Sequence, residues 1–130
     1  MQDIYFVHDH QESPSTRKSF LEMSGYTVTL MKSGAECLEA LGKKKPSLVL
    51  MDVLIDGPNG FDVCRQIRAH YPARDLPVIL TTDIYRSRIY RDEALAAGAQ
   101  AYVLRPIKVE ELVQQVSEVL ARKGAAVPAS

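Results

Sequence analysis

What the sequence has little of limits the kind of protein it can encode. Its 130 residues carry 16 Lys and Arg against 16 Asp and Glu, so the formal net charge is zero. A balanced charge gives no indication of a membrane-surface or direct nucleic-acid binder. The longest apolar runs last only a few residues, far short of the about 20 that a transmembrane helix needs. Because no secretory signal pattern precedes the domain, we expect a cytoplasmic location.

Cysteine is also scarce. The chain has only Cys37 and Cys64, and both fall within stretches with a helical pattern. We expect reduced packing residues rather than a disulfide pair. With 46% hydrophobic residues, a chain of this length can bury a core without such a crosslink. We therefore predict one domain over residues 1–122, followed by a flexible tail or the start of a linker at 123–130.

Short apolar runs alternate with longer amphipathic stretches along the whole chain. Strands are predicted at residues 4–7, 26–30, 48–51, 78–80 and 101–104, with a helix after each of them. Strict alternation of this kind predicts an α/β domain with three layers, in which helices cover both faces of a parallel sheet. The run at 26–30 alternates apolar and polar residues, which predicts an edge strand, whereas the continuous run at 48–51 predicts a central one.

Several helix ends carry signals of their own. Ser33, followed three residues later by Glu36, forms a capping box that predicts a helix start. Gly25 and Gly98 stand where two helices should end, since glycine readily adopts the left-handed conformation found there. The fourth helix is predicted from about residue 85 to residue 97.

Polar side chains follow four of the predicted strands. They are His8, Asp9, Asp52, Thr82, Asp83 and Arg105. In a parallel sheet of this type, the functional site lies beyond the carboxyl ends of the strands, so topology gathers these residues in one place. The carboxylates of Asp9 and Asp52 suit Mg²⁺, which also accepts phosphate oxygens. With Arg105 as a cationic clamp and Thr82 as a hydroxyl donor, the set predicts phosphoryl transfer onto Asp52.

These motifs resemble the CheY-like receiver domains of two-component response regulators, over about residues 3–121. The segments that carry the resemblance are Val7-His8-Asp9, Leu50-Met51-Asp52 with Gly60 eight positions on, Pro77 to Thr82, and Ala94 to Pro106. The resemblance implies a flavodoxin-like, doubly wound sheet of five parallel strands in the order 2-1-3-4-5, with five helices.

The resemblance also implies a role for each site residue. Asp52 would accept a phosphoryl group from a sensor histidine kinase, and Asp9, Asp52 and the backbone carbonyl of Leu54 would hold Mg²⁺. Thr82 and Tyr102 would change rotamer when Asp52 is phosphorylated. The domain would thus be a signalling phosphoacceptor and not an enzyme, beyond its own phosphoryl transfer and slow dephosphorylation.

In this family the output surface is commonly formed by the fourth helix, the fifth strand and the fifth helix. Here that surface would display Arg86, Arg88, Tyr90, Arg91 and Tyr102. The partner would be a downstream effector domain or protein, with a homodimer through the same surface as a further option. Arginines in this pattern most often form a solvated helix face, and the sequence leaves that alternative open.

Three residues depart from the family's pattern. His8 replaces an acidic residue, and a protonated imidazole would oppose Mg²⁺, so we expect weaker and pH-dependent metal binding. Arg105 replaces a lysine and gives a bulkier, planar clamp. Asp83 either restores the missing acid or repels phosphate.

Leu54 and Ile84 are apolar and orient an attacking water poorly, so we expect a long-lived phosphoryl-aspartate.

Two other interpretations stay open. The three departures favour a pseudo-receiver, which keeps the fold as a phosphorylation-independent protein-interaction module, whereas Asp9, Asp52 and Thr82 favour the switch. His8 and His10, together with the two aspartates, would also suit a transition metal, since imidazole and carboxylate bind Zn²⁺ or Fe²⁺.

Overall fold

The computed structural model describes residues 2–9 and 13–122, so the predicted tail at 123–130 lies outside the described residues. Its strands are β1 (Asp3–Val7), β2 (Thr27–Met31), β3 (Leu48–Asp52), β4 (Val78–Thr82) and β5 (Ala101–Leu104). All neighbouring strands are parallel, and the sheet order is β2-β1-β3-β4-β5. This is the predicted order, with β2 at an edge and β3 in the centre.

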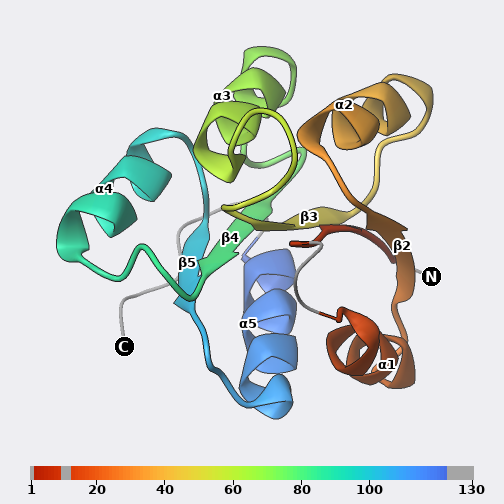
Figure 1. Cartoon of the computed structure of the whole chain (residues 1–130). Coiled ribbons are helices and arrows are strands. Elements are labelled where there is room, and N and C mark those ends of the chain that lie inside the picture. Colours follow the sequence, from red (N-terminus) through yellow and green to blue (C-terminus); the bar gives the residue numbers. More distant parts are fainter. Residues whose placement is uncertain (1, 10–12, 123–130) are drawn as a thin grey trace.

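One helix follows each strand. The helices are α1 (Ser15–Met23), α2 (Gly34–Lys43), α3 (Gly60–His70), α4 (Arg88–Ala96) and α5 (Val109–Ala121). Helices α1 and α5 cover one face of the sheet, and α2, α3 and α4 lie on the other (Figure 1). The predicted three-layer α/β architecture is therefore confirmed. None of the described helices is long and apolar enough to cross a lipid bilayer.

The sheet separates two apolar cores. Ile4 and Phe6 of β1 pack with residues of α1 and α5, while their neighbours Tyr5 and Val7 pack with residues of α2 and α3. Side chains of a strand alternate between the two faces of the sheet, so β1 contributes residues to both cores. Every residue of β3 is buried, including Asp52. Asp52 thus ends a strand that is buried along its whole length.

Most of the predicted helix ends are confirmed. Ser33 Oγ accepts the N–H of Glu36 at 3.1 Å, as a capping box requires. Gly25 and Gly98 have φ values of +99° and +100°, the left-handed conformation expected after a helix. The predicted start of α4 near residue 85 is wrong, because α4 begins at Arg88. The preceding backbone is held instead by the side chains of Thr82 in β4 and Tyr102 in β5.

Both thiols are packing residues. Cys37 and Cys64 are free and buried, which agrees with the prediction of no disulfide between them. Burial raises the pKa of Cys37 to about 12 and that of Cys64 to about 11. Because the thiolate is the reactive form, both groups should be inert in the folded protein.

Candidate functional site

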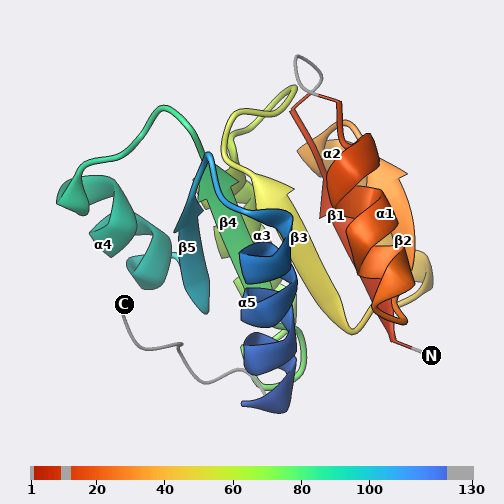
Figure 2. The ribbon, with the colours of Figure 1, turned by 90° about the horizontal axis from the view of Figure 1, so that it is seen from below.

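The segments that follow β1, β3, β4 and β5 meet at one edge of the sheet (Figure 2). Parallel strands place their carboxyl ends together, so residues from distant parts of the sequence become neighbours there. Asp9 follows β1, Asp52 ends β3, and Arg105 follows β5. The structure brings the backbone N–H of Asp9 within hydrogen-bond distance of Asp52 and the guanidinium of Arg105 within ion-pair distance of it.

Both carboxylate oxygens of Asp52 are held by neighbouring groups. The backbone N–H of Asp9 donates to Oδ2 at 2.6 Å, and Arg17 Nη1 donates to Oδ1 at 3.1 Å. Arg105 Nη2 lies 3.9 Å from Oδ1. The side chain of Asp52 has 0% exposure, so these groups, rather than bulk water, surround its charge.

Burial determines the electrostatics of this carboxylate. Loss of water raises the pKa of Asp52 above its usual range, while the charge of Arg17 and the N–H of Asp9 act in the opposite direction. A carboxylate without solvent depends on its neighbours for compensation of its charge. A cation beside Asp52 therefore favours the ionised form of this carboxylate.

Arg17 is a site residue that the sequence reasoning missed. It lies on α1, its side chain is only 11% exposed, and its guanidinium carbon is 4.6 Å from the centre of the Phe6 ring. A signal was present in the sequence, because Arg17 precedes the buried Leu21 by four residues. Residues four apart share a helix face, so a charge at this position faces the interior.

Arg105 lies between carboxylates. Its side chain is 9% exposed, and Nη2 stands 3.8 Å from Asp83 Oδ1 as well as near Asp52. Burial lowers the pKa of Arg105, and the charge of Asp9 acts against this shift. Asp83 is 45% exposed and therefore lies at the rim of the site, beside the clamp.

His8 is buried beside the site. Its Nδ1 lies 3.3 Å from the carbonyl oxygen of Asp9, and its ring meets the Phe6 ring edge-on at 6.0 Å. Among residues 2–9 and 13–122, no three His, Cys, Asp or Glu side chains converge closely enough to hold a metal ion by themselves. His10, the other imidazole considered for a transition-metal site, lies outside the described residues.

Thr82 and Tyr102 meet at the segment between β4 and α4. Thr82 Oγ1 accepts the N–H of Ile84 at 3.2 Å and that of Tyr85 at 3.3 Å. The hydroxyl of Tyr102 donates to the carbonyl of Tyr85 at 2.7 Å, and its ring stacks on Phe61. The expectation that Tyr102 is displayed at the surface is wrong: the residue is 7% exposed, because this bond and this stacking hold it inward.

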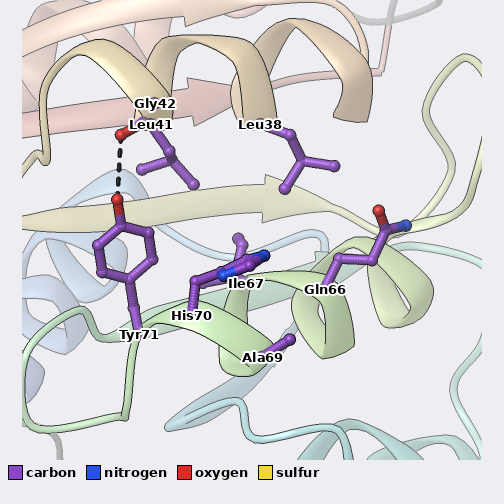
Figure 3. Close-up of a pocket in the computed structure, with 8 residues that line it drawn as sticks. All are labelled: Leu38, Leu41, Gly42, Gln66, Ile67, Ala69, His70 and Tyr71. Atoms are coloured by element: carbon purple, nitrogen blue, oxygen red, sulfur yellow. Dashed lines mark hydrogen bonds between the residues drawn. The ribbon is translucent and has the colours of Figure 1, made fainter.

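An apolar groove between α2 and α3 is not part of this site (Figure 3). Leu41 and Tyr71 line it at the ends of the two helices, where the Tyr71 hydroxyl donates to the Leu41 carbonyl at 3.1 Å. In a parallel α/β sheet the connecting helices run opposite to the strands. The ends of α2 and α3 therefore lie at the edge of the sheet away from Asp52.

Comparisons with known proteins agree with the fold. The sequence model of the response regulator receiver domain matches residues 4–117. Response regulator MprA of Mycobacterium leprae is 34% identical over 121 residues, which cover 92% of this chain and 51% of that protein. The uncharacterised transcriptional regulatory protein YkoG of Bacillus subtilis is 33% identical over 123 residues, which cover 93% of this chain and 52% of that protein.

Solved structures show the same similarity. The BeF3-activated N-terminal receiver domain of RstA from Klebsiella pneumoniae superposes with a TM-score of 0.82 at 26% identity, covering 91% of this chain and 97% of that one. The chain spans about half the length of the curated relatives that it matches.

Proposed function

Because this chain belongs to the family of response regulator receiver domains of two-component systems, we propose that it is a phosphorylation switch whose acceptor is Asp52. The environment of Asp52 carries the proposal. Its carboxylate ends the central strand, and the Asp9 N–H and two arginines all lie within 3.9 Å of its oxygens. Backbone and guanidinium donors around a carboxylate suit phosphoryl transfer, because such donors can take up the charge of the arriving group.

The phosphoryl donor would be a phosphohistidine of a sensor histidine kinase. An oxygen of Asp52 would form a bond to phosphorus as the phosphorus–nitrogen bond breaks, and the leaving imidazole would keep the bonding electrons. The product is an acyl phosphate on Asp52, whose oxygens the forked guanidinium of Arg105 is suited to bind. Since the Asp52 side chain has 0% exposure, its neighbours must move aside before a donor reaches it.

Mg²⁺ is the cofactor that we propose for this step. The carboxylates of Asp9 and Asp52 and the backbone carbonyl of Leu54 would hold it, with His8 beside them. These are oxygen donors of the kind that Mg²⁺ takes, and water completes its coordination. A bound ion would neutralise charge between Asp52 and the phosphoryl group.

We propose that the phosphorylated state is read at the surface formed by α4, β5 and α5. A groove on this surface is lined by Arg91 of α4, Tyr102 of β5, and Glu111 and Glu118 of α5. Opposite charges on two neighbouring helices suit a self-complementary contact between two copies. The proposed partners are therefore a second copy of the chain and a downstream effector domain or protein.

Incubation with acetyl phosphate and Mg²⁺ should add one phosphate to the wild-type protein, and no phosphate to Asp52→Asn. The variant keeps the shape of the side chain but removes the nucleophilic oxygen, so the expected loss of labelling is complete. Intact-mass spectrometry measures both. If wild-type protein gains no phosphate under conditions that label an ordinary receiver domain, the switch is refuted and the phosphorylation-independent interaction module is favoured.

The phosphoryl group on Asp52 should decay slowly. Ile84 is 58% exposed and, like Leu54, offers no polar atom that could orient an attacking water. Because Ile84 is exposed, Ile84→Gln should fold normally and should shorten the lifetime of the adduct by supplying such a group. Mass spectra recorded at intervals after removal of acetyl phosphate give both lifetimes. A wild-type half-life of seconds would contradict this expectation.

A further inference from the structure

The guanidinium of Arg17 is fixed on two sides. Its central carbon lies over the Phe6 ring, 4.6 Å from the ring centre, and Nη1 donates to Asp52 Oδ1 at 3.1 Å. Phe6 is itself completely buried between the sheet and α1. A cation held between an aromatic face and a buried carboxylate is strongly attracted to both, because little water screens either contact.

The other oxygen of Asp52 is already in use. Oδ2 accepts the N–H of Asp9 at 2.6 Å, a short bond of the kind that ionised acceptors make. Arg17 donates a hydrogen bond to Oδ1, and Nη2 of Arg105 lies 3.9 Å from that same atom. A divalent cation that bound Asp52 here would meet the positive charge of Arg17 at the carboxylate it requires.

We propose that Arg17 is a built-in counter-cation of Asp52, and that Arg17 and a divalent cation compete for this carboxylate. The proposal deepens the phosphoacceptor function and rests on it. Two like charges at one buried carboxylate repel each other strongly, so the metal binds only when Arg17 leaves Asp52. That movement gives up both the hydrogen bond to Asp52 and the contact with Phe6.

Two properties of the domain follow. The negative charge of Asp52 is compensated without any metal, so the site is ordered in metal-free protein. The affinity for Mg²⁺ is reduced by the free energy needed to displace Arg17. Arg17 is thus a positioning residue that sets the Mg²⁺ concentration at which the acceptor becomes loaded.

The test is a Mg²⁺ titration at constant ionic strength, followed by the backbone amide resonances of Asp9, Asp52 and Val53. Arg17→Met keeps most of the apolar stem and removes the charge, and it should lower the dissociation constant for Mg²⁺ at least tenfold. Arg17→Lys keeps a cation and should stay near the wild-type value. Lys18→Met is the matched control: it makes the same change of net charge one residue later, where Lys18 pairs with the exposed Glu22.

Equal Mg²⁺ dissociation constants for wild type and Arg17→Met would overturn the proposal, as would the absence of Mg²⁺ binding in both. If Arg17→Met does not fold, the side-chain Nε–H resonance of Arg17 in the wild-type protein decides. It should shift together with the Asp52 amide as Mg²⁺ is added, and a constant Arg17 resonance would refute displacement. Failure of acetyl phosphate to label Asp52 would refute the switch but would leave this comparison of metal affinities unchanged.

Discussion

Replacement of Arg68 by methionine should lower the free energy of unfolding by about 4 kcal/mol. The reason is that the partly buried guanidinium donates hydrogen bonds to four oxygen atoms. Nε donates to the Gly98 carbonyl at 2.9 Å, and Nη2 donates to Gln100 Oε1 at 2.7 Å. Nη1 donates to the carbonyls of Tyr71 and Leu76 at 3.1 and 2.7 Å. One side chain thereby joins the end of α3, the segment before β4 and the turn between α4 and β5.

The loss is large because methionine would fill the space of the stem but donate no hydrogen bond. Carbonyl groups that lose a donor away from water each cost about 1–3 kcal/mol. The turn is also built around this side chain: a Cβ atom at Gly98 would lie 2.6 Å from Cγ of Arg68. Movement of Arg68 therefore disturbs a backbone that already needs the left-handed conformation, with φ of +100°.

Urea unfolding followed by far-UV circular dichroism measures this effect. Arg65→Met is the matched control, since Arg65 lies three residues earlier on the same helix and pairs with Asp62 and Glu93 at the surface. Its side chain is 46% exposed, and exposed ion pairs contribute at most about 1 kcal/mol. Equal losses of stability in the two variants would show that the network around Arg68 is not a stabilising unit.

The sheet and the position of the acceptor could be predicted from the sequence because both follow from local patterns. The continuous apolar run of β3 identifies a central strand, and Asp52 is the first polar residue after it. The topology of parallel sheets then places Asp9 and Arg105 beside Asp52 without any knowledge of side-chain contacts. The expected edge position of β2 was confirmed for the same reason, since its alternation reports one solvated face.

The remaining features depend on contacts between elements, which local patterns do not contain. The segment before α4 is not helical because the Tyr102 hydroxyl and the Thr82 hydroxyl hold the carbonyl and the N–H of Tyr85. Arg68 has no neighbour in the sequence that indicates its partners in the segments before β4 and β5. Arg17 could have been noticed as a charge on the Leu21 face of α1, but only the fold shows that this face meets Asp52.

Thr82→Val should leave the phosphorylation of Asp52 possible and prevent Tyr102 from responding to it. In the structure the Thr82 hydroxyl holds the N–H groups of Ile84 and Tyr85, and the Tyr85 carbonyl holds the Tyr102 hydroxyl. If the Thr82 hydroxyl turns to a phosphoryl oxygen on Asp52, the Tyr85 backbone is released. Tyr102 then loses the fixed carbonyl that accepts its hydroxyl. Valine has the same shape but no hydrogen-bonding atom, so this connection is lost while strand β4 remains intact.

The readout is the set of aromatic ring resonances of Tyr102, recorded with and without acetyl phosphate and Mg²⁺. They should change on phosphorylation of the wild-type protein and of Thr82→Ser, which retains a hydroxyl, and should stay constant in phosphorylated Thr82→Val. The mass of each sample shows that the adduct is present. An unaltered response of Tyr102 in Thr82→Val would mean that the signal leaves Asp52 by another route, of which Arg105 is the nearest candidate because its backbone N–H bonds to the Thr82 carbonyl at 2.8 Å.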